Sequence, residues 1–84
     1  MGKTGAIVTS DPERALASVA GGVPAVLVGR DPAELGRALG RACGGDGGPC
    51  LLGVMVGDLS SPAVCAAALE MARELWPWAA GGPG

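Results

Sequence analysis

The chain has 84 residues, of which 49% are hydrophobic, and its eight acidic and six basic residues give a net charge of −2. This length suits one small domain with a single core, and the acidic balance argues against a protein that coats nucleic acid non-specifically. The sequence has no histidine, and two tryptophans are its only aromatic residues. We therefore expect a core of Ala, Val and Leu, and we expect neither a metal site nor a cofactor.

The first strand–helix unit lies between residues 5 and 22. Residues 5–9 are small or apolar on both faces, which favours a strand that is covered on two sides. A helix start follows: Asp11 can accept from free backbone N–H groups, Pro12 suits a first turn, and Glu13 favours the positive end of the helix. Gly21-Gly22 ends this helix.

A second unit of the same kind occupies residues 23–43. Val23–Gly29 is a predicted strand, and Asp31-Pro32 repeats the helix start. Glu34, Arg37 and Arg41 mark the polar side of the following helix. Gly36 and Gly40 lie inside the helix, where each costs up to about 1 kcal/mol relative to Ala. Close approach of another backbone, from the sheet or from a ligand, would be a reason for these two glycines.

The third unit begins with Cys50–Gly57, the most apolar segment, which we predict to be an interior strand. Asp58–Pro62 starts the last helix, which ends before Pro77. Trp76 falls on the apolar side of this helix, although the segment Trp76-Pro77-Trp78 as a whole is expected to be exposed. We predict one domain over residues 1–78 and a flexible Gly/Pro tail over residues 79–84.

Alternation of strands and helices predicts an α/β fold: a three-layer α/β/α sandwich with a small, three-stranded, mostly parallel sheet. Right-handed crossovers would place all three helix N-termini at one edge of this sheet. Because three strands are few, pairing of a sheet edge with a second copy is one expected interaction.

The three cysteines do not form a disulfide framework, because their number is odd. Cys43 and Cys50 flank a glycine-rich loop and are able to approach each other, but we interpret the cysteines as buried or half-buried free thiols. The apolar run Cys50–Val56 is too short to span a bilayer, and residues 1–8 lack the long apolar segment typical of a secretory signal. We expect a cytoplasmic protein without a membrane partner.

Nucleophilic or acid–base catalysis finds no support in the sequence, so we expect that the protein is not an enzyme and has no small-molecule substrate. Ser60 and Ser61 lack a histidine base. Asp11, Asp31 and Asp58 follow the three strands, and two of them are explained as helix caps. Arg30, Arg37 and Arg41 are better candidates for binding, although a solvated helix face with Glu34 paired to Arg37 is the alternative interpretation.

The run Val23-Pro24-x-x-x-Val28-Gly29, followed by Leu35-Gly36-Arg37-Ala38-Leu39-Gly40, resembles the signature of a family of ribosomal proteins, the L-seven-Ae and L-thirty-e family. Members of that family have a strand that begins Val-Pro, then a turn, then a helix that opens Leu-Gly-(Arg/Lys)-Ala-x-Gly. Residues 6–13 are similar to the central strand of the family and its exit into a helix. The resemblance covers roughly residues 3–58.

The resemblance implies a non-enzymatic α/β/α sandwich, with a small mixed sheet, that binds kinked internal loops of RNA called kink-turns. Contacts to RNA would come from the loop after the Val-Pro strand and the start of the next helix, where an Arg and a helix N-terminus meet phosphate. With the basic side of that helix included, the RNA-binding residues would be Val28, Gly29, Arg30, Leu35, Gly36, Arg37 and Arg41.

The sequence departs from the family in one element. An earlier helix opening Gly-x-Asn-Glu is the main RNA-reading element of the family, and this sequence contains no Asn. Asp31 and Glu34 also place negative charge where phosphate would lie. We expect either an RNA-binding helper that lost the recognition helix or a start site set too late.

Two other classes of function remain open. A protein-interaction or oligomer-forming domain is favoured by the acidic charge, by the sheet edge and by Trp76 and Trp78. An anion-binding regulatory domain rests only on the three helix N-termini at one sheet edge.

Overall fold

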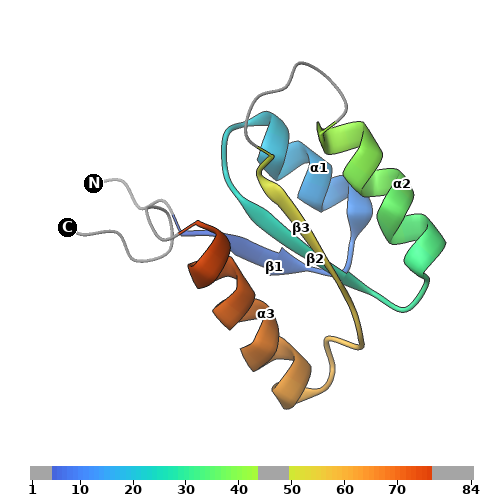
Figure 1. Ribbon diagram of the computed structural model, residues 1–84, viewed down its shortest axis with the longest axis vertical. Coiled ribbons are helices and arrows are strands. Elements are labelled where there is room, and N and C mark those ends of the chain that lie inside the picture. Colours follow the sequence, from blue (N-terminus) through green and yellow to red (C-terminus); the bar gives the residue numbers. More distant parts are fainter. Residues whose placement is uncertain (1–4, 44–49, 77–84) are drawn as a thin grey trace.

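The computed structural model describes residues 5–43 and 50–76. Six elements alternate in these ranges (Figure 1): β1 (Ile7–Thr9), α1 (Pro12–Ala20), β2 (Ala25–Gly29), α2 (Pro32–Cys43), β3 (Leu52–Val56) and α3 (Pro62–Leu75). The predicted α/β alternation is confirmed. Trp78 and the tail over 79–84 lie outside the described residues.

Each helix begins where the sequence predicts, since a proline opens it and a polar side chain caps it. Asp11 Oδ1 accepts a hydrogen bond from the backbone N–H of Glu13 at 3.1 Å, and Asp31 Oδ1 accepts one from Ala33 at 3.0 Å. At the start of α3 the cap is Ser61, whose Oγ accepts from the Val64 N–H at 3.5 Å. These bonds satisfy N–H groups that have no partner inside the helix.

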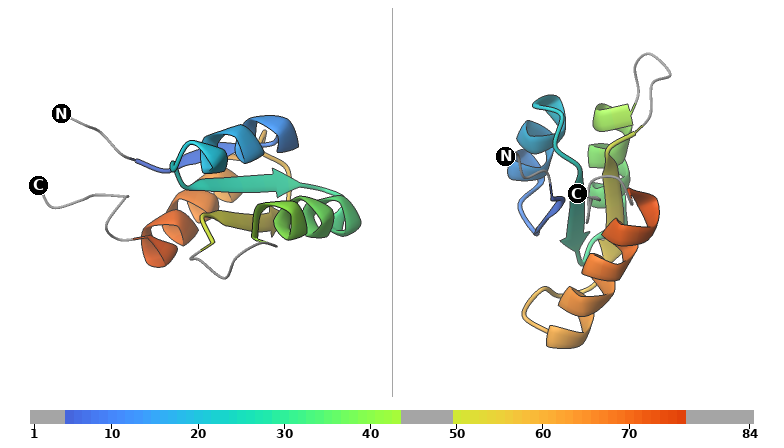
Figure 2. Two further views of the ribbon diagram at one scale, coloured as in Figure 1. Left: turned by 90° about the horizontal axis from the view of Figure 1, so that it is seen from above. Right: turned by 90° about the vertical axis from the view of Figure 1, so that its left-hand side faces the viewer.

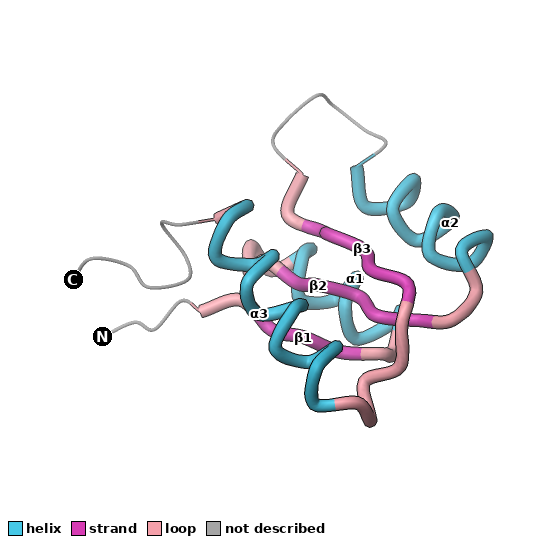
Figure 3. The backbone as a smooth tube through the Cα atoms, turned by 60° about the horizontal axis from the view of Figure 1, so that its bottom comes forward, coloured by secondary structure: helices cyan, strands magenta, loops and turns pink. Residues whose placement is uncertain are grey.

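The three described strands form a parallel sheet in the order β1-β2-β3 (Figure 3). Ala25 of β2 lies opposite Ile7 of β1 and Leu52 of β3. The prediction that Cys50–Gly57 is interior is wrong, because β2 is central and β3 is an edge strand. Helices α1 and α2 cross the same face of the sheet, so each crossover carries the chain one strand further in one direction.

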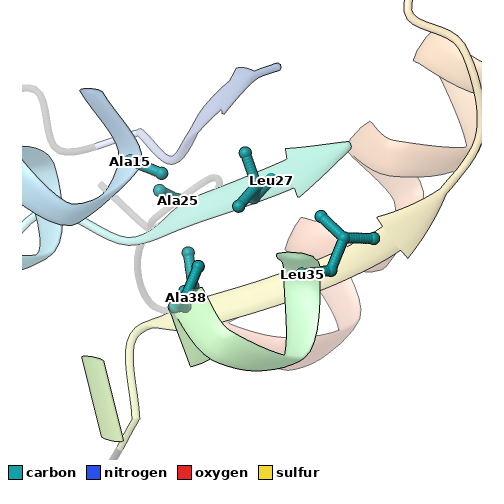
Figure 4. Packing of buried hydrophobic residues seen from close by; sticks show 6 residues of the cluster. Ala15, Ala25, Leu27, Leu35 and Ala38 are labelled. Atoms are coloured by element: carbon teal, nitrogen blue, oxygen red, sulfur yellow. The ribbon is translucent and has the colours of Figure 1, made fainter. Parts of the chain in front are cut away.

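Helices cover both faces of the sheet, with α1 and α2 on one side and α3 on the other (Figure 1). Side chains of β2 alternate between the two faces. Figure 4 shows the cluster under α1 and α2, which contains the buried residues Ala15, Ala25, Leu27, Leu35, Ala38 and Leu52. The cluster under α3 contains Val26, Val28, Ala68, Ala72 and Trp76. The structure is therefore a three-layer α/β/α sandwich.

Trp76 is only 5% exposed, so its predicted place on the apolar side of the last helix is confirmed, and the expectation that the Trp76–Trp78 segment is exposed is wrong at this residue. The end of α3 lies over Gly53, where a Cβ would lie 2.9 Å from Met71 Cε and 3.1 Å from Leu75 Cδ1. The absent side chain of Gly53 thus lets these side chains of α3 pack closely on β3 beside the indole. Trp76 Nε1 also donates a hydrogen bond to the carbonyl oxygen of Cys50 at 3.3 Å.

None of the helices in the described ranges is long and apolar enough to cross a membrane.

Candidate functional site

The seven residues predicted to contact RNA separate into buried and exposed groups. Val28 is 0% exposed and Leu35 is 4% exposed, so their side chains form core and are not available to a ligand. Gly29 is half-buried, and a Cβ there would lie 3.1 Å from Leu35 Cδ2. Gly29 therefore serves the contact between β2 and α2. The exposed members are Arg30, Gly36, Arg37 and Arg41.

Arg37 and Arg41 lie one turn apart on α2, a spacing that places them on the same side of a helix. Within residues 5–43 and 50–76 the salt bridge is Glu70–Arg73 on α3, at 3.8 Å. The interpretation that Glu34 pairs with Arg37 is therefore wrong. Two exposed guanidinium groups on α2 are left free of carboxylates from the described part of the chain.

Arg30 belongs to a different environment, because it follows β2 before α2 begins. Its positive charge contributes to lowering the pKa of Asp58, which follows β3. The main cause of the lowered pKa is Ser60, whose backbone N–H and hydroxyl donate to Asp58 Oδ1 at 3.0 and 2.9 Å. Asp58 therefore holds a turn before α3, while Ser61 is the cap. Arg30 and Asp58 together bring opposite charges to the carboxyl ends of β2 and β3.

Gly36 and Gly40 face open space. A Cβ built at either position would meet nothing within 4 Å, so the expected close approach of a neighbouring backbone is absent among the described residues. The two interior glycines make α2 a less stable helix than alanines would, and no contact among the described residues explains their presence.

The interpretation of Cys43 and Cys50 as free thiols is wrong, since the structure joins them in a disulfide with a Cα–Cα distance of 5.3 Å. The bond connects the end of α2 to the residue before Leu51 and β3. In a strand–helix–strand unit with parallel strands, the helix ends near the start of the next strand. Cys43 at the end of α2 and Cys50 just before β3 are therefore brought together. Cys65 on α3 is a free, half-buried cysteine.

No group of three or more His, Cys, Asp or Glu residues able to hold a metal ion occurs in the part of the chain that the structure describes. Comparisons of the chain with protein-family models, with curated proteins and with solved structures find no match. The resemblance to the ribosomal family thus stays a prediction from the sequence motif. That resemblance implies a mixed sheet, whereas the three described strands all run parallel.

Proposed function

We propose that this chain is a small, non-enzymatic domain that binds structured RNA through Arg30, Arg37 and Arg41. The observation that carries the proposal is the pair of exposed arginines one turn apart on α2, without carboxylate partners among the described residues. Guanidinium groups in such positions bind phosphate oxygens, which supply most of the affinity of proteins for nucleic acid. The family resemblance of residues 23–40 supports kink-turn RNA as the target.

The test is a titration of the purified chain with a kink-turn RNA and with an unkinked duplex, at two salt concentrations. We expect kink-selective binding that weakens as salt rises, because cations leave the phosphates on binding. Arg37→Ala and Arg41→Ala should each weaken binding by about threefold to tenfold and lower the salt dependence by about one unit of slope.

Arg73→Ala is the matched control, because Arg73 is exposed on α3, across the sheet from α2, and pairs with Glu70. It should leave RNA affinity unchanged. Glu34→Gln should raise affinity, since it removes a negative charge near Arg37 and Arg41. Equal binding of both RNAs, or equal losses for Arg37→Ala and Arg73→Ala, would contradict the proposal.

The second candidate function is a protein-interaction or oligomer-forming domain. It is favoured by the apolar strand β3 at the edge of the sheet, and by Val56 at the end of that strand, which is 61% exposed.

A further inference from the structure

Strand β3 has the sequence of an interior strand and the position of an edge strand. Its residues, Leu-Gly-Val-Met-Val, include no charged residue and no proline. Charges and prolines are the usual means by which edge strands avoid pairing with another chain. In the described ranges, the outer side of β3 has no neighbouring strand. An apolar, unprotected edge of five residues is suited to pair with a further strand.

The direction of the free backbone groups of β3 follows from its hydrogen bonds to β2. Leu51 O accepts from Ala25 N–H at 2.9 Å, and Gly57 N–H donates to Gly29 O at 2.8 Å. Backbone groups alternate in direction along a strand, so odd-numbered residues of β3 face β2. The N–H and C=O groups of Leu52, Val54 and Val56 therefore point away from the sheet.

This set of outward groups matches itself when a second β3 runs antiparallel. Val54 would then lie opposite Val54 of the second copy, and Val56 opposite Leu52 of the second copy. Each of these pairs would exchange both backbone hydrogen bonds, as in an antiparallel ladder. The exposed Val56 side chain would also be covered by an apolar neighbour. The edge thus needs no partner other than another copy of the same strand.

Helix α2 leaves room above this edge for the α2 helix of a second copy. Helix α2 packs over the edge strand β3 through its buried side (Figure 2). Its Cys43 is bonded to Cys50, which leads into β3, so the side of α2 that carries Cys43 lies toward the open edge of the sheet. Gly36 and Gly40 precede Cys43 by seven and three residues, which places them on the same side of the helix. We call Gly36, Gly40 and Cys43 the glycine flank. Apart from the backbone of α2 itself, neither glycine has a described atom within 4 Å of its Cβ position.

We propose that two copies of this chain form a two-fold dimer in which their β3 strands pair antiparallel about Val54 and their α2 helices meet at the glycine flanks. Paired strands lie about 4.8 Å apart and packed helices about 8–10 Å apart, so two helices that each lie over the edge of the joined sheet come within packing distance on one face. Helices at the shorter end of that range require small residues where they touch. Arg37 and Arg41 lie outside the glycine flank, so the dimer contact and the proposed RNA contact are separate surfaces.

The test is sedimentation equilibrium of the purified chain over a range of concentrations, without RNA. A denaturing gel without reductant identifies covalently linked chains. We expect a mass of two chains that dissociates on dilution. Gly40→Leu places a large side chain in the glycine flank, and Val56→Lys places a charge on the edge. Each should weaken the dimer at least tenfold and leave the circular dichroism of the monomer unchanged.

Two matched controls use the same substitutions elsewhere. Ala17→Leu adds the same side chain type at an exposed position of α1, and Leu69→Lys adds the same charge at a residue of α3 that is 51% exposed. Neither should alter the dimer. A chain that stays monomeric overturns the proposal, as does a dimer that Leu69→Lys dissociates and Gly40→Leu does not.

Amide hydrogen exchange tests the register directly. The amide hydrogens of Leu52, Val54 and Val56 should exchange more slowly as the chain concentration rises. Those of Gly53 and Met55 should be protected from exchange at every concentration. A dimer in which the three even-numbered amides gain no protection would rule out pairing through β3.

Discussion

At the scale of single residues, Gly57 shows how closely α3 approaches the loop after β3. A Cβ at this position would lie 3.0 Å from Val64 Cγ1 and 3.3 Å from Val64 Cγ2. Val64 stands in the first turn of α3, where a β-branched side chain has essentially one rotamer. It is therefore unable to turn away from an added methyl group.

We predict that Gly57→Ala lowers the free energy of unfolding by about 1–2 kcal/mol, the usual cost of overpacking. Urea denaturation followed by circular dichroism measures this change. Val64→Ala removes both methyl groups that cause the clash. The double variant should therefore lose about 1 kcal/mol less unfolding free energy than the two single variants lose together. Additive effects would show that the contact with Val64 is not the cause.

At the scale of elements, the disulfide closes the connection between α2 and β3. Cys43 and Cys50 are seven positions apart, so the bond encloses a short loop. In the chain-entropy view, such a cross-link restricts the unfolded chain and stabilises the folded one.

We predict that reduction of this disulfide lowers the free energy of unfolding by about 2–3 kcal/mol, the chain-entropy value for a loop of this length. Urea denaturation with and without reductant measures the difference. The double variant Cys43→Ser/Cys50→Ser should have the lowered stability in both conditions. If reductant destabilises that double variant equally, the effect of reductant must come from elsewhere.

The elements themselves were predictable from the sequence because their signals are local. Asp11-Pro12, Asp31-Pro32 and Ser61-Pro62 each combine a capping side chain with a residue that suits a first helical turn, and all three helices begin there. The apolar segments before them became strands. No long-range contact was needed for these predictions.

Features that depend on how elements meet were not predictable in the same way. The apolar sequence of Cys50–Gly57 predicts an interior strand. The strand order depends instead on α1 and α2 crossing the same face of the sheet, which makes β2 the central strand. Cys43 and Cys50 are bonded because the end of α2 lies at the same end of the sheet as the start of β3. The predicted RNA site mixed buried Val28 and Leu35 with exposed arginines, since a sequence motif does not separate structural from contacting positions.

At the scale of the whole molecule, one chain of contacts connects all three layers. The disulfide ties α2 to Cys50 before β3, and the carbonyl of Cys50 accepts the indole N–H of Trp76 from the end of α3. The Trp76 ring belongs to the cluster on the α3 face, together with Val26 and Val28 of the central strand. Small domains bury a limited core, so one large side chain at such a junction carries much of their stability.

We predict that Trp76→Phe lowers the free energy of unfolding by about 1–3 kcal/mol, because the Cys50 carbonyl loses its indole donor and the ring leaves unfilled space. Leu69→Ala is the control: Leu69 is 51% exposed on the same helix, and its truncation should cost within about 0.5 kcal/mol. Circular dichroism during urea denaturation measures both changes.

Urea denaturation with and without reductant also tests whether the two interactions of Cys50, its disulfide to Cys43 and its hydrogen bond from Trp76, depend on each other. Reduction of the disulfide releases Cys50 from α2, so the carbonyl that Trp76 binds is held less firmly. Trp76→Phe should therefore cost less in the reduced protein than in the oxidised one. An equal cost in both states would mean that the hydrogen bond to Cys50 does not depend on the disulfide, and that the α2 and α3 layers are fastened to β3 independently.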